Sequence, residues 1–370
     1  MVTTAVTVAT LAMGILVMVE PAAAADAATR PPITGIARVT VLMTDAVPAM
    51  AFYARTLGLT SADAGCGKAV TACLSVNERQ RIELRAMNDT PTTLPGTQPS
   101  PTASAAASKD SRVAGIAFAT PNVAQMRRYL ASKGLKPDDI AADASHIKSF
   151  SVVDPEGHLI TFIEQTASAG VTNASTAATP TATATAATPG ATATPAAAPV
   201  APTSGAATTP ASTADASKQT VKNSARVSTK LIHAGFVVRD RAAEDHFYKD
   251  ILGFHLYWQG GMKDDELSWV SMQVPDGTDW LEYMLNVAPN ADAHTEGVMN
   301  HVALGVASVA AAKDNLVANG WQPAEEPKIG RDGKWQLNVY DPDGTRVEFM
   351  EFTPVEKPCC TSFTGSHPRP

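Results

Sequence analysis

The chain has 370 residues, of which 45% are hydrophobic and 18% charged, and its formal net charge is −7. This length predicts about two domains, and the apolar share is sufficient for packed cores. The acidic balance, without a basic stripe interleaved with aromatic residues, argues against a nucleic-acid partner. We expect a small metabolite instead.

The first 26 residues are interpreted as a signal peptide. Residues 5–19 form an apolar run that is followed by small residues up to Asp26, as in a secretory leader with its cleavage site. The run is too short for a typical transmembrane helix. We therefore expect a periplasmic or secreted protein, with an uncleaved membrane anchor as the alternative.

Two low-complexity stretches divide the rest of the chain. Residues 166–225 are rich in Ala, Thr and Pro and cannot form a core, which predicts a flexible, disordered linker. A shorter stretch of this kind, residues 88–108, is predicted to be a surface insertion in the first domain. Folded domains are therefore expected at 31–165 and 226–356, followed by a tail at 357–370.

The two predicted domains repeat each other's motifs. Residues 52–58 (FYARTLG) return as 247–253 (FYKDILG), and residues 154–157 (DPEG) return as 341–344 (DPDG). The first motif is typical of the end of an amphipathic helix with a glycine cap. The second is typical of a tight turn before a strand.

The second domain is predicted to contain two units, each with one strand, one helix and three further strands. The first unit has a strand at 231–238, a helix at 241–252 and strands near 255–259, 267–273 and 280–285. The second unit has a strand at 300–306, a helix at 309–319 and strands near 322–328, 335–340 and 345–352. Residues 286–297 are expected to form the loop between the units.

Four residues on these strands have side chains that divalent first-row metals prefer. Histidines lie near strand starts and glutamates near strand ends, and this donor set suits Ni, Zn, Fe, Mn or Co. Two histidines and two glutamates in one core would be costly to bury without a cation. The predicted metal ligands are His233, Glu282, His301 and Glu348. The remaining histidines, His158 and His367 among them, are interpreted as surface residues.

The four cysteines are less informative. Cys66 and Cys73 are close enough in sequence to pair across a hairpin. For the adjacent Cys359 and Cys360, a strained bond with each other, pairing elsewhere and no pairing all stay open.

Together these motifs resemble the vicinal oxygen chelate superfamily, which includes glyoxalase I, extradiol dioxygenases and bleomycin-resistance proteins. The resemblance implies an α+β fold of two domains, each of which pairs two βαβββ units into an open, cup-shaped sheet. In the second domain the four predicted ligands occupy all the metal positions of a glyoxalase-I-like protein. The matching positions in the first domain are Arg38, Glu83, Gly115 and Thr161. Because an arginine stays protonated and cannot bind a metal, we expect this domain to be degenerate.

The resemblance implies a metal-dependent lyase or isomerase that converts a small metabolite with vicinal oxygens through an enediolate. Glu348 is expected to bind the metal and also to transfer the proton, with a pKa that burial raises. Asn286 and Arg239 are expected to bind the substrate. Similar enzymes carry an arginine at the position of Val237, and Arg239 lies two residues further on the same strand face. The thiol that such an enzyme would use, glutathione or another, stays open.

Two alternatives remain. An extradiol-type Fe(II) dioxygenase would use His233, His301 and Glu348, although Glu282 would then occupy a position that dioxygen needs. A non-catalytic resistance protein would bind a metabolite or antibiotic in the same cup. The sequence is compatible with a homodimer and with pairing of the two domains within one chain.

Overall fold

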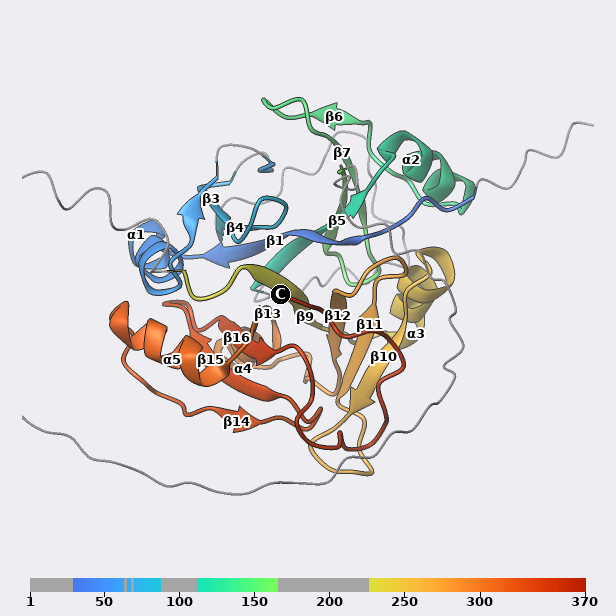
Figure 1. Ribbon diagram of the computed structural model, residues 1–370. Coiled ribbons are helices and arrows are strands. Elements are labelled where there is room, and N and C mark those ends of the chain that lie inside the picture. The colour runs from blue at the N-terminus through green and yellow to red at the C-terminus, as the bar shows by residue number, and fades with distance from the viewer. Residues whose placement is uncertain (1–28, 63–64, 68–69, 88–111, 166–225) are drawn as a thin grey trace, which may run out of the picture.

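The computed structural model describes residues 29–62, 65–67, 70–87, 112–165 and 226–370. The predicted signal peptide, the insertion and the linker lie outside these residues. The described part contains two eight-stranded sheets with few helices (Figure 1). No helix in it has the length and apolarity that a membrane span needs.

The first sheet has the strand order β2-β3-β4-β1-β5-β8-β7-β6. Two helical segments accompany it: α1 (Ala46–Met50), which continues as the π-helix η1 (Ala51–Thr56), and α2 (Val123–Ser132). The strands are β1 (Gly35–Met43), β2 (Thr60–Ser61), β3 (Ala72–Ser75), β4 (Arg81–Ala86), β5 (Val113–Thr120), β6 (Ala141–Ala142), β7 (Lys148–Val153) and β8 (Leu159–Glu164).

The second sheet repeats this topology in the order β10-β11-β12-β9-β13-β16-β15-β14. Its helices are α3 (Arg241–Glu244), which continues as the π-helix η2 (Asp245–Ile251), α4 (Ala293–Met299) and α5 (Val309–Ala318). Its strands are β9 (Lys230–Val237), β10 (His255–Gly260), β11 (Trp269–Gln273), β12 (Trp280–Met284), β13 (His301–Val306), β14 (Lys328–Ile329), β15 (Trp335–Tyr340) and β16 (Arg346–Glu351).

The predicted α+β fold is confirmed, with two local corrections. The strand expected at 322–328 is reduced to β14 because Pro323 and Pro327 cannot donate backbone hydrogen bonds to a ladder. The segment expected as a loop contains α4. Asp292 caps this helix by accepting a hydrogen bond from the Thr295 amide, and such a capping residue is a signal that the sequence does contain.

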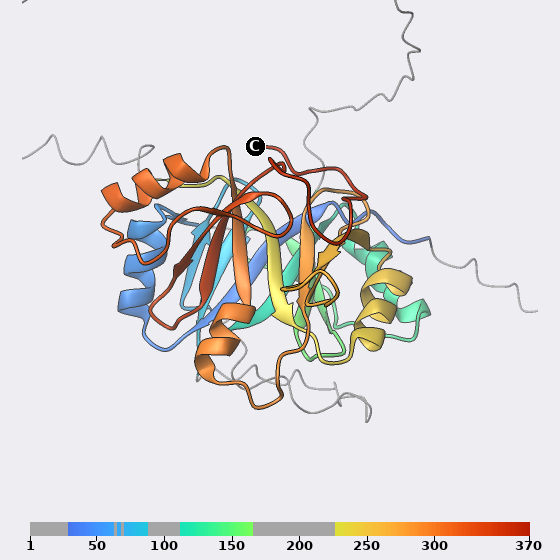
Figure 2. The ribbon, with the colours of Figure 1, turned by 90° about the horizontal axis from the view of Figure 1, so that it is seen from below.

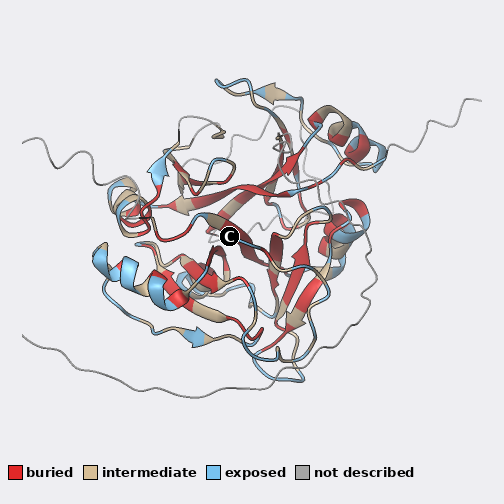
Figure 3. Cartoon of the chain, in the orientation of Figure 1, coloured by how far each residue is buried: buried red, intermediate tan, exposed pale blue. Residues whose placement is uncertain are grey.

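One continuous hydrophobic core joins the two domains. Phe118 on β5 packs against Phe254, which follows η2, with ring centroids 5.3 Å apart. Buried residues accordingly run through the central strands of both sheets, whereas the outer faces of the helices are exposed (Figure 3). The sheets are therefore parts of one packed body.

The repeated motifs contact each other across the two domains. Tyr53 of η1 donates a hydrogen bond of 3.0 Å to Asp341, and Tyr248 of η2 donates one of 2.9 Å to Asp154. All four residues are buried. Each helix end thus binds the Asp-Pro turn of the other domain. These contacts explain why both motifs occur in each domain, and they pair the two domains within one chain.

The helices also pair across the domains. In Figures 1 and 2, α1 lies beside α5 and α2 lies beside α3. Tyr129 of α2 donates a hydrogen bond to the Ile251 carbonyl at 2.6 Å, and Asn319 after α5 donates one to the Thr56 carbonyl at 3.0 Å.

Gln80 anchors β9, the strand that carries His233, to the first domain. Its buried amide donates hydrogen bonds to the carbonyls of Ile36 at 3.0 Å and Leu231 at 2.8 Å, and it accepts one from the Leu231 amide at 2.9 Å. Gln80 thus bonds to both the amide and the carbonyl of Leu231 and connects β9 to β1 of the first domain.

Candidate metal centre

The sheet register brings the four predicted ligands to one face of the second sheet. Trp280 on β12 and Ala303 on β13 are the neighbours of His233. Glu282 and His301 both pair with Gly235, and Glu348 pairs with Ala303. Because paired residues in neighbouring strands share a face, two imidazoles and two carboxylates converge in the cup.

The distances within this group are short. The two Nε2 atoms of His233 and His301 are 3.0 Å apart. Glu348 Oε2 lies 3.4 Å from His233 Nε2 and 3.8 Å from His301 Nε2. These three residues each place one ligand atom within 4.8 Å of the others. Glu282 is outside that triad, but its Oε2 lies 3.4 Å from His301 Nε2.

Gly235 provides the space that the His301 ring occupies. A Cβ atom at this position would lie 1.9 Å from His301 Cε1 and 2.2 Å from Nδ1. No side chain larger than hydrogen therefore fits between β12 and β13 at this level of the cup.

The environment keeps His301 in the neutral form that binds metals. Its Nδ1 lies 3.0 Å from the Met299 carbonyl, which can only accept a hydrogen bond, and 2.8 Å from Arg346 Nη2, which can only donate one, so these two contacts favour opposite tautomers of the ring. Burial and the positive charge of Arg346 lower the pKa of this imidazole.

Both carboxylates are ionised in this environment. Burial alone would raise the pKa of Glu348, but the contact with His233 and the charge of Arg346 lower it to about 2. The pKa of Glu282 is likewise lowered, since its contacts with the two histidines outweigh its burial. The expectation of a raised pKa for Glu348 is therefore wrong, because these contacts outweigh its burial.

The donor set fits a divalent first-row metal. Two imidazoles and two carboxylates converge, and the negative charges of the two carboxylates would match one dication. His233 Nδ1 is buried without a hydrogen-bond partner among the described residues. That imidazole is held instead by packing against Trp280, with ring centroids 4.6 Å apart.

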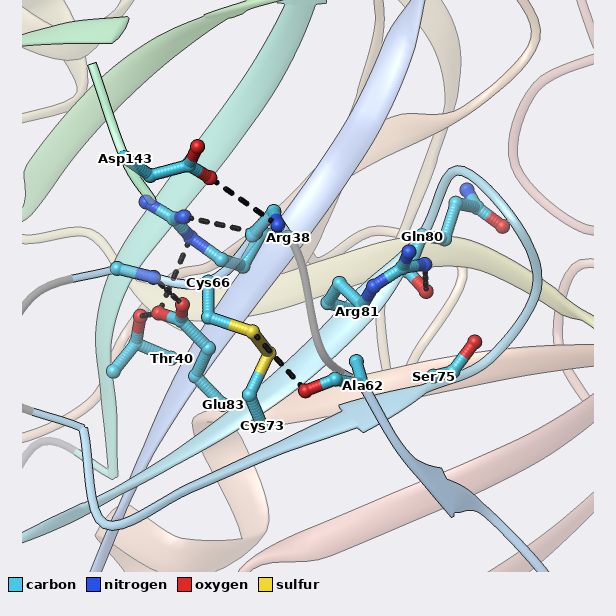
Figure 4. Close-up of a disulfide and its surroundings, with 12 residues drawn as sticks. Arg38, Thr40, Ala62, Cys66, Cys73, Ser75, Gln80, Arg81, Glu83 and Asp143 are labelled. Carbon is cyan, nitrogen blue, oxygen red and sulfur yellow. Dashed lines mark hydrogen bonds and ion pairs between the residues drawn. A yellow bond between two sulfur atoms is a disulfide. The ribbon is translucent and has the colours of Figure 1, made fainter. Parts of the chain in front are cut away.

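The first domain has a different group at the matching positions (Figure 4). Arg38 forms an ion pair of 3.1 Å with Glu83, which also accepts a hydrogen bond of 2.9 Å from Thr40. The carboxylate at the ligand position is thus neutralised by the protein. Beside it, Cys66 and Cys73 form the predicted disulfide. A cavity of about 440 Å³ lies in this cup.

The two predicted substrate-binding residues have other partners. The Arg239 guanidinium forms an ion pair of 3.0 Å with Glu296 of α4. Asn286 is exposed, has a φ of 62° and donates a hydrogen bond of 2.9 Å to the Leu267 carbonyl. The structure brings neither of them into the group of metal ligands, and their role in substrate binding stays a prediction.

Several polar residues near the ligands were missed in the sequence. Lys334, Asp332 and Asn338 are buried, and Lys334 and Asp332 interact electrostatically with Glu282 and Glu348. Alternation along β15 could have placed Asn338 beside Glu348, with which it pairs. No local signal distinguishes Lys334 from an ordinary turn lysine.

Two further expectations need correction. His158 is buried rather than exposed and lies 2.9 Å from Asp154, because Phe236 of the other domain covers its ring. His367 is half-buried and contacts the Tyr257 hydroxyl. Cys359 and Cys360 form a disulfide with each other, one of the arrangements that the sequence leaves open.

Comparisons with known proteins agree with this architecture. The model of the Glyoxalase/Bleomycin resistance protein/Dioxygenase superfamily matches residues 230–349. No curated protein gives a match.

The similar solved structures include extradiol dioxygenases. Homoprotocatechuate 2,3-dioxygenase from Arthrobacter globiformis has a TM-score of 0.51 and 17% identity, over 87% of this chain and 80% of that one. The Brevibacterium fuscum enzyme in complex with 3,4-dihydroxyphenylacetate has a TM-score of 0.50 and 17% identity, over 87% and 82%. At such identities the likeness shows a shared fold alone. The second domain, residues 230–349, therefore matches the glyoxalase and dioxygenase superfamily, and the described chain shares the two-domain fold of these neighbours.

Proposed function

We propose that the second domain is a metal-dependent lyase or isomerase that acts on a small metabolite with two vicinal oxygens. The observation that carries the proposal is the convergence of two imidazoles and two carboxylates in one buried cup. His233, His301 and Glu348 would hold a divalent metal, with Glu282 beside them. The metal would supply Lewis-acid polarisation of the substrate oxygens.

The two carboxylates have different environments, which suggests different roles. Glu348 is almost fully buried, contacts both histidines and lies in the field of Arg346. The Glu282 side chain is 13% exposed, contacts His301 and lies 3.5 Å from the Ser271 hydroxyl. The sequence favours Glu348 as the proton-transferring residue, whereas the geometry favours Glu282.

In this reaction Glu282 would remove a proton from the carbon beside a polarised carbonyl and return it to the neighbouring carbon. An ionised carboxylate with few fixed partners can make this transfer, because it can turn without leaving a buried charge unpaired. Ser271 would orient the carboxylate in its ionised state. The buried Glu348 would keep its position during the transfer.

An extradiol-type dioxygenase is the second candidate, and one observation favours it. His233, His301 and Glu348 form by themselves the two-histidine, one-carboxylate triad that non-haem Fe(II) oxygenases use. The similar solved structures are enzymes of that class. In this case Glu282 would be dispensable for metal binding and for turnover.

Glu282→Gln separates the two candidates. Wild type and variant would be loaded with Zn, Ni or Mn and assayed with the hemithioacetal of methylglyoxal and glutathione. The Fe(II) forms would be assayed for oxygen uptake with 3,4-dihydroxyphenylacetate. We expect isomerisation by the wild type and its loss, by about 100-fold or more, in a variant that still binds metal. Oxygen uptake that survives in the variant would establish the dioxygenase instead.

A further inference from the structure

Lys334 is a fully buried cation in the turn before β15. Its ammonium group donates a hydrogen bond of 3.2 Å to the Tyr257 hydroxyl. It also lies over the rings of Trp280 at 4.7 Å, Phe363 at 5.0 Å and Tyr257 at 5.2 Å from the ring centroids. The group is thus enclosed by three aromatic side chains.

No described carboxylate forms an ion pair with this ammonium within 4.0 Å. The nearby Asp332 accepts hydrogen bonds from the backbone amide of Lys334 and from Gln336, both at 3.1 Å. Removing an ammonium group from water is costly when no anion compensates. Contacts with ring faces recover only part of that cost, and a methionine would fill the same space without it.

Lys334 belongs to the cup of the metal ligands. The Trp280 ring, over which the ammonium lies, packs directly against the His233 ring. Burial lowers the pKa of Lys334 to about 8, and the nearby carboxylates of Asp332, Glu348 and Glu282 partly oppose this lowering. The Trp280 ring therefore contacts both the Lys334 ammonium group and the His233 imidazole.

The C-terminal tail, residues 357–370, forms the outer wall around Lys334. Phe363 packs on Tyr257 with centroids 4.8 Å apart, and His367 Nδ1 lies 2.5 Å from the Tyr257 hydroxyl. The Thr364 amide donates a hydrogen bond of 3.0 Å to the Tyr257 carbonyl. In Figure 1 this dark red segment runs beside β10 and β11. The tail thereby fixes the side chains that enclose the cation.

We propose that Lys334 binds an acidic group of the substrate, so that the second cup selects small acids that also carry vicinal oxygens. This inference rests on the proposed function, because the vicinal oxygens would be held at the metal ligands. Beyond the proposed function, it names small acids as the substrate class and Lys334 as the residue that selects them. The acidic group would replace ring faces as the partner of the two ammonium N–H groups that Tyr257 does not use.

The test compares two probes that differ only at their far end. Butyrohydroxamate ends in a methyl group and succinohydroxamate in a carboxylate, and both present vicinal oxygens to a metal. Each would be titrated calorimetrically into zinc-loaded, full-length wild type, Lys334→Met and Lys249→Met. Lys249 is exposed on η2, so its substitution makes the same chemical change away from the cup.

The wild type and Lys249→Met are expected to bind succinohydroxamate about 10- to 100-fold more tightly than butyrohydroxamate, the range expected for one charge-assisted contact. Lys334→Met is expected to lose this preference and to bind butyrohydroxamate as the wild type does. Circular dichroism and zinc content would show that each variant is folded and loaded, and Lys334→Gln would replace a methionine variant that is not.

Equal affinities in the wild type, or a preference that persists in both Lys334 variants, would overturn the inference. Zinc-loaded protein that binds neither probe would overturn it as well. Wild-type protein that takes up no zinc would instead contradict the proposed function, so the two failures give different results.

Discussion

The reciprocal contacts between the repeated motifs predict that two matched tyrosine variants differ in stability. Tyr53→Phe and Tyr248→Phe each remove one buried hydrogen bond to a carboxylate across the domain pair. Such a bond contributes about 1.5–3 kcal/mol to the free energy of unfolding. The structure indicates which variant should lose more.

The two aspartates keep different partners after the substitution. Asp154 retains hydrogen bonds from the His158 amide at 2.7 Å and imidazole at 2.9 Å, and His158 has a raised pKa because Asp154 and Glu156 outweigh its burial. Asp341 retains only backbone donors, from Thr345 at 2.8 Å and Asp343 at 2.9 Å, and burial already raises its pKa to about 6. Tyr53→Phe should therefore cost about 3 kcal/mol and Tyr248→Phe about 1.5 kcal/mol.

Urea unfolding followed by tryptophan fluorescence and by circular dichroism measures both values. Tyr129→Phe serves as the control, because it removes a bond to a neutral carbonyl across the same pair and should cost about 1 kcal/mol. Since one core joins the domains, a single transition is expected for each protein. Equal losses in the two tyrosine variants, the reverse order, or two separate transitions would refute this reasoning.

Two further substitutions test the cup and the domain contact. Gly235→Ala should displace the His301 ring, because the new Cβ would lie 1.9 Å from Cε1. The affinity for zinc should then fall more than about tenfold, while the sheet is retained. An unchanged zinc affinity would contradict the proposed site. Burial raises the pKa of Glu244 to about 10, so the native state holds a proton that the unfolded state releases above a pH of about 4.3. This stabilising contribution is present below that pH and is lost as the pH rises. Glu244→Gln should therefore match the wild type near pH 4 and exceed its stability by up to about 4 kcal/mol at pH 7.5, and a constant difference across that range would count against this assignment.

Much of the second domain was predictable because its signals are local. Short, largely apolar runs predict strands such as β9 and β12, which are buried nearly throughout. The glycines at the ends of the repeated helix motifs adopt the positive φ values that a cap needs, 69° at Gly58 and 79° at Gly253. The convergence of the four predicted ligands was predictable because histidines near strand starts and glutamates near strand ends recur in both units. The register then placed them together.

The remaining features depend on contacts between distant segments. His158 has the composition of an exposed turn residue, and only Phe236 of the other domain makes it a buried one. Lys334 acquires its aromatic surroundings from β10, β12 and the tail. The sequence also could not distinguish the roles of Glu282 and Glu348, because their exposure and partners arise from packing.

The central claim is that the second cup holds one divalent metal. Its most direct test is the metal content of full-length wild type and of His233→Ala, measured by elemental analysis after separate incubation with Zn, Ni, Mn and anaerobic Fe(II), followed by desalting. The account predicts about one metal per wild-type chain, since one set of ligands converges, and a large loss in the variant. A wild type that retains none of these metals, or a variant that retains as much as the wild type, would contradict it.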